Sequence, residues 1–562
     1  MILSQRLLAA QGERYPATDR ADRRFVLGGQ SLLLVLLLFA VVLPLLAIFW
    51  RGLAGDPSQG GGLASAHFRW LLENSLATAG TVVALVVPIA FMFAYALQRA
   101  CLPAKGLWRA LSLLPLLAPS MLPGIALIYL FGNQGLLRGL VADNIYGFWG
   151  IVLGQALYTF PHALMVLLGS LALADARLFD AAASLGASPW RTFRSLVWPA
   201  ARQGVFAASC LVLSLCITDF GIPVVVGGHY QTLALEAYKV VMGQQQFGRG
   251  ALIGLCLLLP ALLSFGVDLW LRRRQRGALD GRVQPYRPCS TPLRDHGLLL
   301  LVVLVCALLV GVYGTAVYSS LVRFWPYDLS LSLHNYAFAD LPGGWQAYGN
   351  SLLLASSSAL LGGLLIFTGT YLVEKTPQTT LTQLLRLLCF IPMAVPGLVL
   401  GLGYVFFYNL PANPLHGLYG GLPLLAVCTV AHFLTTAQLT AATALRQLDD
   451  EFEAAARALK VPLALHFLRV TVPLCLPALL DSIRYLFVSA MTTVSAAIFL
   501  YSPDSLLAAI AVLNLDDAGN VGGAAAMATL ILLTSAGVSL LLAGLSRGLL
   551  RRTQAWRIPT AS

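Results

Sequence analysis

The chain has 562 residues, of which 58% are hydrophobic and 11% are charged. Soluble domains carry about a quarter charged residues, so this chain lacks the polar groups to cover its surface in water, and we expect a lipid bilayer to surround it. The net charge of +12 does not indicate a nucleic-acid partner, because the arginines cluster in short segments beside apolar runs.

Apolar runs of about 20 residues predict an all-α polytopic membrane protein with about twelve transmembrane helices. In the first half they fall near residues 27–50, 75–97, 110–132, 148–172, 204–228 and 250–271. In the second half they fall near residues 297–320, 351–373, 385–408, 421–444, 476–500 and 523–546. The first run is too long for a signal peptide and lacks an A-x-A cleavage site, so we interpret it as a retained span.

Positive charge predicts the orientation of these spans. The amino tail (1–26), the central linker (272–296) and the carboxyl tail (547–562) hold five, seven and four arginines. The loop 322–349 holds one arginine, and the loop 409–420 holds none. The positive-inside rule therefore places both termini and the linker in the cytoplasm, with two six-span repeats at 27–271 and 297–546.

The two halves share landmarks in the same order and at nearly the same spacing. The matched residues are Asn74 and Asn350, Tyr95 and Tyr371, Pro115 and Pro392, Pro119 and Pro396, and Pro199 and Pro473. The spacing is 274 to 277 positions throughout. Because each half has an even number of spans, we expect parallel repeats related by a pseudo-twofold axis along the membrane normal.

A polar, alanine-rich segment lies between two apolar runs in each half, on the predicted cytoplasmic side. In the first half it reads Asp180-Ala-Ala-Ala-Ser-Leu-Gly186, with Pro199 thirteen residues after the glycine. We expect a short helix over 176–188 that Gly186 ends in a left-handed cap, followed by a second helix beginning at Ser188-Pro189. Small side chains would let such a hairpin lie close against a partner surface.

The second half carries a degraded copy of this segment. It runs from Ala454 to Lys460, with Pro473 following at the same distance. Lys460 replaces the glycine, and a residue other than glycine is uncommon at positive φ. We therefore expect the two hairpins to be unequal.

These segments resemble the cytoplasmic motif of binding-protein-dependent ABC importer permeases, in the fused form in which one chain supplies both halves. The family motif runs Glu-Ala-Ala, three residues, Gly, nine residues, Ile-x-Leu-Pro. The matching residues in the first half are Asp180, Ala181, Ala182, Gly186 and Pro199. Those in the second half are Ala455, Ala456 and Pro473, with Glu453 one residue before the acidic position and Lys460 at the glycine. The resemblance covers about 75–270 and 350–546.

The resemblance implies a non-enzymatic transport subunit in a bacterial inner membrane. The hairpins would dock into two copies of an ABC ATPase subunit, and a solute-binding protein would deliver substrate from outside. The chain has no GxxxxGK[ST] motif, so ATP and Mg²⁺ are expected on the partner ATPase, and no cofactor is expected in this chain. Segments 218–223, 238–247 and 491–496 resemble the ferric-iron and 2-aminoethylphosphonate group, and the glutamine-rich second segment favours a phosphonate.

Four polar residues are candidates for lining the translocation path: Asp219, Thr492, Thr493 and Ser495. An acid within an apolar run is costly and usually faces a cavity or a partner. The repeat aligns Asp219 with Thr493, and we expect the two to face each other near the membrane midplane. The alternative for Asp219 is a structural hydrogen bond to a neighbouring helix, and helix-to-helix hydrogen bonding is the favoured interpretation of the Thr and Ser residues.

Two other classes of function explain the sequence less completely. A secondary carrier driven by an ion gradient would explain two six-span halves, but it leaves the duplicated alanine-rich segments unexplained. A membrane-embedded enzyme is not supported, because the sequence shows no Ser/His/Asp order, no HExxH motif and no paired intramembrane carboxylates. The nine cysteines form no CxxC pair and the eight histidines show no ligand spacing, so neither a disulfide framework nor a metal site is predicted.

Overall fold

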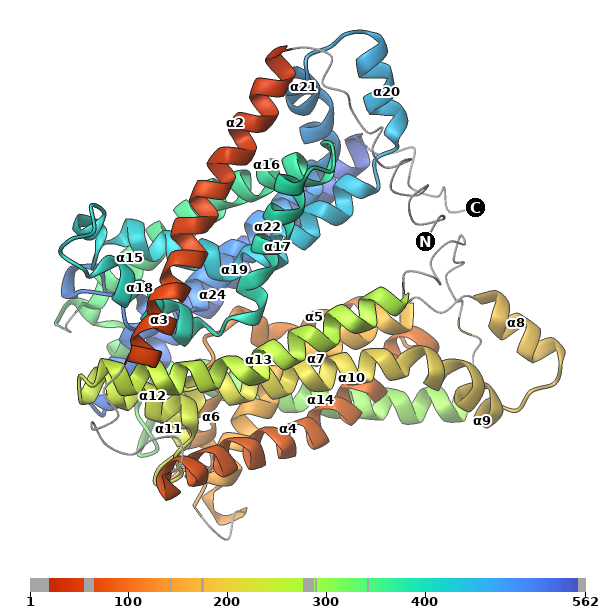
Figure 1. The fold of residues 1–562 in the computed structure, drawn as a ribbon. Coiled ribbons are helices and arrows are strands. Elements are labelled where there is room, and N and C mark those ends of the chain that lie inside the picture. Colours follow the sequence, from red (N-terminus) through yellow and green to blue (C-terminus); the bar gives the residue numbers. More distant parts are fainter. Residues whose placement is uncertain are drawn as a thin grey trace. The chain divides into compact units, whose positions relative to one another are not determined.

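The computed structural model describes residues 20–54, 65–140, 144–172, 176–275, 288, 291–340 and 343–553. These residues are almost entirely helical, which confirms the predicted all-α class (Figure 1). A small antiparallel hairpin joins strand β1 (Val322–Phe324) to strand β2 (Asp328–Leu331). Most of the predicted amino tail, linker and carboxyl tail lies outside the described residues.

The helices group into two compact units. Unit 1 comprises the chain up to Arg51, Trp345–Ala508 and the chain from Leu532 onward, and unit 2 comprises Gly52–Gly344 and Ala509–Ile531. The main helices of unit 1 are α2 (Arg20–Leu37), α3 (Leu43–Ala54), α15 (Gly344–Ser357), α16 (Gly363–Glu374), α17 (Thr380–Phe390), α18 (Gly397–Tyr408), α19 (Leu422–Arg446), α20 (Asp450–Ala458), α21 (Leu463–His466) and α22 (Val472–Thr492).

Unit 2 contains most helices of the first half together with the first helix of the second half. They are α4 (Ala66–Arg99), α5 (Lys105–Ser112), α6 (Leu122–Phe131), α7 (Phe148–Ala172), α8 (Ala176–Ser184), α9 (Pro189–Thr192), α10 (Trp198–Thr218), α11 (Gly221–Val226), α12 (Leu233–Tyr238), α13 (Phe247–Gln275) and α14 (Pro292–Ser320). Helix α23 (Ala508–Asp517) falls almost wholly in unit 2, and the long α24 (Val521–Thr553) is divided at Leu532.

The sequence repeat recurs element by element. Helices α7, α8, α9 and α10 begin and end 274 positions before α19, α20, α21 and α22, respectively. A five-residue π-helical segment follows the short helix in both copies, at Phe193–Val197 and Phe467–Thr471. Such agreement in boundaries means that the two halves share one local fold.

The first helix of each half packs in the unit built mainly from the other half. Helix α2 contacts α16 and α17 of unit 1, and α14 contacts α5 and α6 of unit 2. The Tyr404 and Tyr408 hydroxyls donate to the carbonyls of Ala40 (2.7 Å) and Phe39 (3.0 Å), which lie in a π-helical segment between α2 and α3. The spatial units therefore differ from the contiguous repeats 27–271 and 297–546 that the sequence suggested.

The described residues contain fewer continuous spans than the sequence predicted, which was about twelve. Among the described residues, ten helices are long and apolar enough to cross a membrane, or eleven if one bent pair counts as a span. That pair, Thr380–Ala394 and Gly397–Tyr408, bends by 113° at Pro396. The predicted span 110–132 is likewise divided, into α5, a 3₁₀ turn and the ten-residue α6. Proline interrupts these helices because it lacks an N–H and disfavours the helical conformation of the preceding residue.

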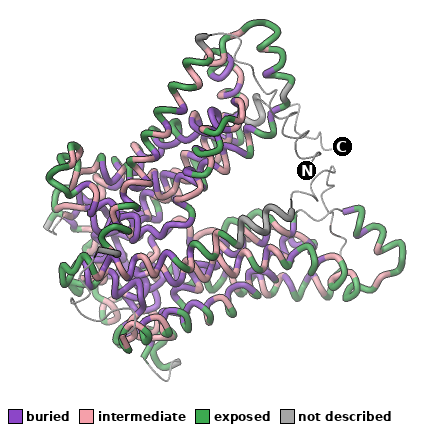
Figure 2. The backbone as a smooth tube through the Cα atoms, in the orientation of Figure 1, coloured by how far each residue is buried: buried purple, intermediate pink, exposed green. Residues whose placement is uncertain are grey.

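Burial within the helices matches a lipid surround (Figure 2). On α14, Leu300, Leu304 and Leu308 are each about 60% exposed and recur every four residues, so they form one apolar stripe. The opposite face of this helix carries buried Val302, Cys306 and other apolar residues. A stripe of exposed leucine on a long helix is what a bilayer would cover.

Candidate functional site

The first alanine-rich segment forms a helical hairpin, here called hairpin 1, from α8 and α9. Helix α8 ends in two backbone hydrogen bonds, from Ala187 N to Ala182 O and from Gly186 N to Ala183 O, each 3.0 Å long. Gly186 has φ +67°, so this is the left-handed helix end that the sequence predicted. The Ser188 side chain then accepts a hydrogen bond from Arg191 N (3.3 Å) and caps α9.

The second segment forms hairpin 2, from α20 and α21, with the same ending. Val461 N donates to Ala456 O (2.9 Å), and Lys460 N donates to Arg457 O (3.0 Å). Lys460 has φ +53° and therefore occupies the left-handed conformation that glycine occupies in hairpin 1. The expected inequality of the hairpins is absent from the backbone, although the lysine adopts a conformation that favours glycine.

The start of the second short helix is capped differently in the two hairpins. Pro462 stands at the N-cap of α21, where its side chain cannot accept a hydrogen bond. Asp22 of α2 supplies the acceptor instead, because its Oδ1 lies 2.9 Å from Leu463 N. A residue 441 positions away in the sequence thus completes hairpin 2, a contact that no pattern in the sequence indicates.

A cluster of three aromatic rings joins hairpin 1 to α4, and a matching cluster joins hairpin 2 to α16. In hairpin 2 the Phe467 ring lies 4.5 Å from Tyr371 and 6.0 Å from Phe367, centroid to centroid. In hairpin 1 the Phe193 ring lies 6.1 Å from Tyr95 and 6.3 Å from Phe91. All three positions match between the halves at offsets of 274 to 276. The tyrosines noted as sequence landmarks are therefore part of the hairpin anchors.

A buried arginine also holds hairpin 1. Arg99 is the last residue of α4 and is 3% exposed. Its Nη2 donates to Leu171 O near the end of α7 (3.1 Å), and its guanidinium carbon lies 4.4 Å from the ring centroid of Phe179 on α8. Arginine over an aromatic face is a favourable cation–π contact, so one side chain connects α4, α7 and α8.

A buried lysine takes the equivalent place in hairpin 2. Lys375 directly follows α16, and its Nζ lies 2.9 Å from Glu453 Oε1 on α20. The same Nζ donates to Leu448 O, after the end of α19 (3.3 Å). Both side chains of the ion pair are less than 10% exposed. Neither Arg99 nor Lys375 was singled out from the sequence, although they lie four residues after the matched tyrosines.

Glu453 therefore differs from the other motif residues. Asp180, which fills the acidic position in hairpin 1, is exposed, whereas Glu453 is 3% exposed and points inward at the position of Phe179. Its one-residue displacement from the acidic position turns the carboxylate to the other face of the helix, because successive residues of a helix point about 100° apart. A direct contact of Glu453 with a partner would conflict with this burial, so its expected role becomes an internal one.

The remaining motif residues lie in the hairpins or just after them and are exposed or half-buried. Most of α8 and α20 is exposed (Figure 2). The exposed motif residues are Asp180, Ala181, Gly186, Pro199, Ala455, Lys460 and Pro473, while Ala182 and Ala456 are half-buried. A large apolar residue precedes the left-handed residue in both copies: Leu185 is 86% exposed and Leu459 is 76% exposed. Each hairpin therefore presents small residues and, directly before its left-handed residue, an uncovered leucine; hairpin 1 also exposes Leu178 (55%) and Trp190 (70%).

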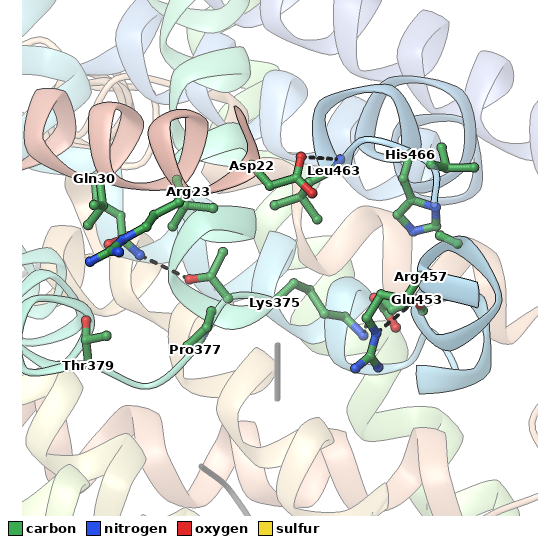
Figure 3. Close-up of a pocket in the computed structure, with 15 residues that line it drawn as sticks. Asp22, Arg23, Gln30, Lys375, Pro377, Thr379, Glu453, Arg457, Leu463 and His466 are labelled. Carbon is green, nitrogen blue, oxygen red and sulfur yellow. Dashed lines mark hydrogen bonds and ion pairs between the residues drawn. The ribbon is translucent and has the colours of Figure 1, made fainter. Parts of the chain in front are cut away.

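A cavity of about 240 Å³ adjoins hairpin 2 within unit 1 (Figure 3). Helix α2 contributes Asp22, Arg23 and Gln30, the end of α16 contributes Lys375, and the hairpin contributes Glu453, Arg457 and His466. Gln30 Nε2 donates to Leu372 O and to Thr376 Oγ1, each at 3.0 Å, which fixes α2 to the end of α16. The wall of this cavity therefore includes Asp22, Lys375 and Glu453, whose contacts also hold hairpin 2.

Asp219 lies where α10 breaks, in extended backbone at φ −79° and ψ +126°. Its Oδ1 accepts from Gly221 N (3.1 Å) and its Oδ2 from Gln155 Nε2 of α7 (3.3 Å). These bonds agree with the interpretation of Asp219 as a link between helices, and its role in the path stays a prediction.

The three second-half candidates cluster at the equivalent break after α22. Thr493 has φ −72° and ψ +135°, close to the angles of Asp219, and is 6% exposed. Thr492 Oγ1 donates to Val488 O within its own helix (2.9 Å). A Cβ placed on Gly397 would overlap Ser495 Oγ, so this serine packs closely against the start of α18. Asp219 and Thr493 belong to different units, and their predicted approach stays a prediction.

A duplicated bundle of apolar helices with one exposed hairpin per repeat defines a class of membrane transport subunit. The family of binding-protein-dependent transport system inner membrane components matches residues 87–277 and 366–551, more than half of the chain. The chain belongs to this family, and both matched regions contain a hairpin. It is accordingly a fused, two-half permease of the ABC importer type, located in the inner membrane.

The chain is similar to several curated transport permeases. The ferric transport system permease protein FbpB of Actinobacillus pleuropneumoniae is 28% identical over 535 residues, which cover 91% of this chain and 76% of the relative. The molybdenum transport system permease protein ModB of Escherichia coli (strain K12) is 27% identical, covering 36% of this chain and 92% of the relative. The thiamine transport system permease protein ThiP of Salmonella typhimurium is 26% identical, with coverages of 58% and 61%.

Proposed function

We propose that this permease imports ferric iron, and that hairpins 1 and 2 are the coupling elements to which two copies of an ABC ATPase subunit dock. ATP binding draws the two ATPase copies together, and each hairpin follows its own copy. The two halves then alternate between inward-open and outward-open states around a path that includes Asp219 and Thr493. The permease performs no covalent step, since coupling requires only that the states bind their partners differently.

The exposed leucine in each hairpin carries the docking proposal. Leu185 and Leu459 are 274 positions apart, and both are exposed in segments predicted to lie on the cytoplasmic side of the membrane. The flanking residues Ala182 and Ala456 are small, so a partner surface can approach the helix backbone closely. A duplicated apolar tip on a polar hairpin is typical of a protein interaction site.

The substrate proposal rests on how much of this chain each relative matches. The ferric permease of Actinobacillus pleuropneumoniae matches 91% of this chain, including both halves, whereas the molybdenum permease of Escherichia coli matches 36% of it. This similarity favours iron over the phosphonate suggested by the glutamine-rich segment 238–247. A solute-binding protein is the proposed donor of the iron on the outer side.

Docking is tested by replacing the leucine before the left-handed residue in each hairpin. Leu185→Asp and Leu459→Asp are combined in the full chain and coexpressed with its ATPase. We expect at least a tenfold loss of copurified ATPase, because a carboxylate would be buried at each contact. Leu331→Asp is the matched control, since Leu331 is 72% exposed on β2, far along the chain from either hairpin. Normal ATPase binding by the double variant would contradict the docking assignment.

The substrate and the energy source are tested in proteoliposomes that contain the complete complex. We expect uptake of radioactive ferric iron from its binding protein, dependent on ATP and insensitive to an uncoupler. Uptake of 2-aminoethylphosphonate instead of iron would overturn the substrate proposal alone. Uptake that needs no ATP but collapses with an uncoupler would favour a secondary carrier.

A further inference from the structure

We propose that Arg99 and Lys375 are positioning residues that make each coupling hairpin move as one body with the membrane helices. The inference rests on the proposed docking of hairpins 1 and 2. Each residue is a buried cation at the end of the second helix of its repeat, and each connects that helix end to two other segments. Their contacts lie within a single unit in both cases.

The equivalence of the two positions is the first support. Arg99 and Lys375 are 276 positions apart, and their partners Phe179 and Glu453 are 274 positions apart. Both cations donate to a carbonyl at or just beyond the end of the long helix that leads into the hairpin. Arg99 donates to Leu171 O of α7, and Lys375 donates to Leu448 O after α19. The cation is therefore kept in both repeats while its partner changes from an aromatic ring to a carboxylate.

The chemistry of the partners explains why each pair suits its cation. The planar guanidinium of Arg99 can stack on the Phe179 ring and still donate from its edge. The ammonium of Lys375 is a compact charge that needs an anion when it is buried, and Glu453 supplies one at 2.9 Å. Each pair joins the inward face of the coupling helix to the bundle, while the outward face of that helix remains uncovered.

A rigid connection is what force transfer requires. The α8 and α20 helices are nine residues long and have few inward-facing side chains. Of the α20 residues with described burial, Glu453 is the only one that is buried. Without its ion pair, α20 would be attached to the bundle mainly through the chain itself and the α21 anchors.

The test measures whether α20 and α16 move together. Spin labels at exposed Leu365 of α16 and exposed Ala458 of α20 report one distance in the full complex with its ATPase, without nucleotide and with ATP. We expect a single narrow distance that ATP leaves unchanged. In Lys375→Met the distance should broaden or change with ATP, and stimulation of ATP hydrolysis by the binding protein should fall at least fivefold.

Two further variants separate positioning from folding. Lys375→Arg combined with Glu453→Phe copies the pair of hairpin 1 and should restore the narrow distance. Arg446→Met removes the ion pair between the exposed Arg446 side chain and Glu374 at the same end of the unit and should leave the distance unchanged. If Lys375→Met lowers the yield of complex, Glu453→Gln provides the same test with nearly unchanged side-chain volume.

The outcomes distinguish the two proposals. A narrow, nucleotide-independent distance in both Lys375→Met and Glu453→Gln, with the ATPase bound, would overturn the positioning role. If the Leu185→Asp, Leu459→Asp variant also kept its ATPase, the docking proposal would fail as well. If the double leucine variant lost its ATPase while the distance stayed narrow in Lys375→Met and Glu453→Gln, only the positioning role would be refuted.

Discussion

Replacement of Lys460 by glycine should stabilise hairpin 2. Lys460 has φ +53°, and the left-handed conformation costs a residue with a Cβ about 1–2 kcal/mol. Glycine removes this cost but gains about 0.4–1 kcal/mol of conformational freedom in the unfolded chain, which opposes the benefit. The net stabilisation should be about 0.5–1 kcal/mol, equivalent to a factor of about 2–5 in an equilibrium constant.

Amide hydrogen exchange in α20 measures this change, because exchange there reports local opening of the hairpin. In Lys460→Gly, the amides of Leu459 and Val461 should exchange about 2–5 times more slowly than in the parent chain. Lys460→Ala is the control, since it removes the charge and keeps the unfavourable φ, and it should leave the rate close to that of the parent.

The reciprocal change in hairpin 1 completes the test. Gly186 has φ +67°, and nothing lies within 4 Å of a Cβ placed there, so Gly186→Ala introduces backbone strain without a steric clash. Exchange in α8 should become about 2–5 times faster. Equal rates in Lys460→Gly and Lys460→Ala, or an unchanged rate in Gly186→Ala, would refute the reasoning from backbone conformation.

Three further predictions concern other contacts. Asp22→Ala removes the cap of α21 and should destabilise hairpin 2 by about 1 kcal/mol, seen as faster exchange at Leu463, whereas Asp22→Asn should retain most of the protection. Gly397→Ala should push against Ser495 at a cost of about 1–3 kcal/mol, lowering the melting temperature, and Ser495→Gly in the same chain should recover most of the loss. Burial, and secondarily the charge of Asp517, raises the pKa of Asp516 in α23 to about 6. Because this pKa exceeds the unfolded value of 3.8, the protonated form favours folding, and stability from this group should fall as the pH rises from about 4 to about 6. Asp516→Asn should weaken the dependence of the melting temperature on pH between about 4 and about 6. An unchanged pH dependence would contradict the assignment.

The sequence was sufficient for the helical class, the duplication and the two hairpins. These features depend on local patterns: apolar runs of membrane length, recurring prolines, and an alanine-rich helix that ends at a left-handed residue. The prolines were recognised as landmarks, but their consequence was misjudged, since they divide two of the twelve predicted spans. Continuous hydrophobicity does not show where a helix bends, because lipid and protein can cover the apolar side chains of a bent segment equally well.

The inward contacts of the hairpins were decided by tertiary structure. Asp22 caps a helix 441 positions away, and Glu453 turns from an expected surface contact into the buried partner of Lys375. Sequence spacing by itself could establish that Arg99 and Lys375 occupy equivalent places, yet only packing revealed that one meets a ring and the other a carboxylate. The physical reason is that a charge in an apolar bundle must find a partner in space, and the fold determines which distant residue is near enough to serve.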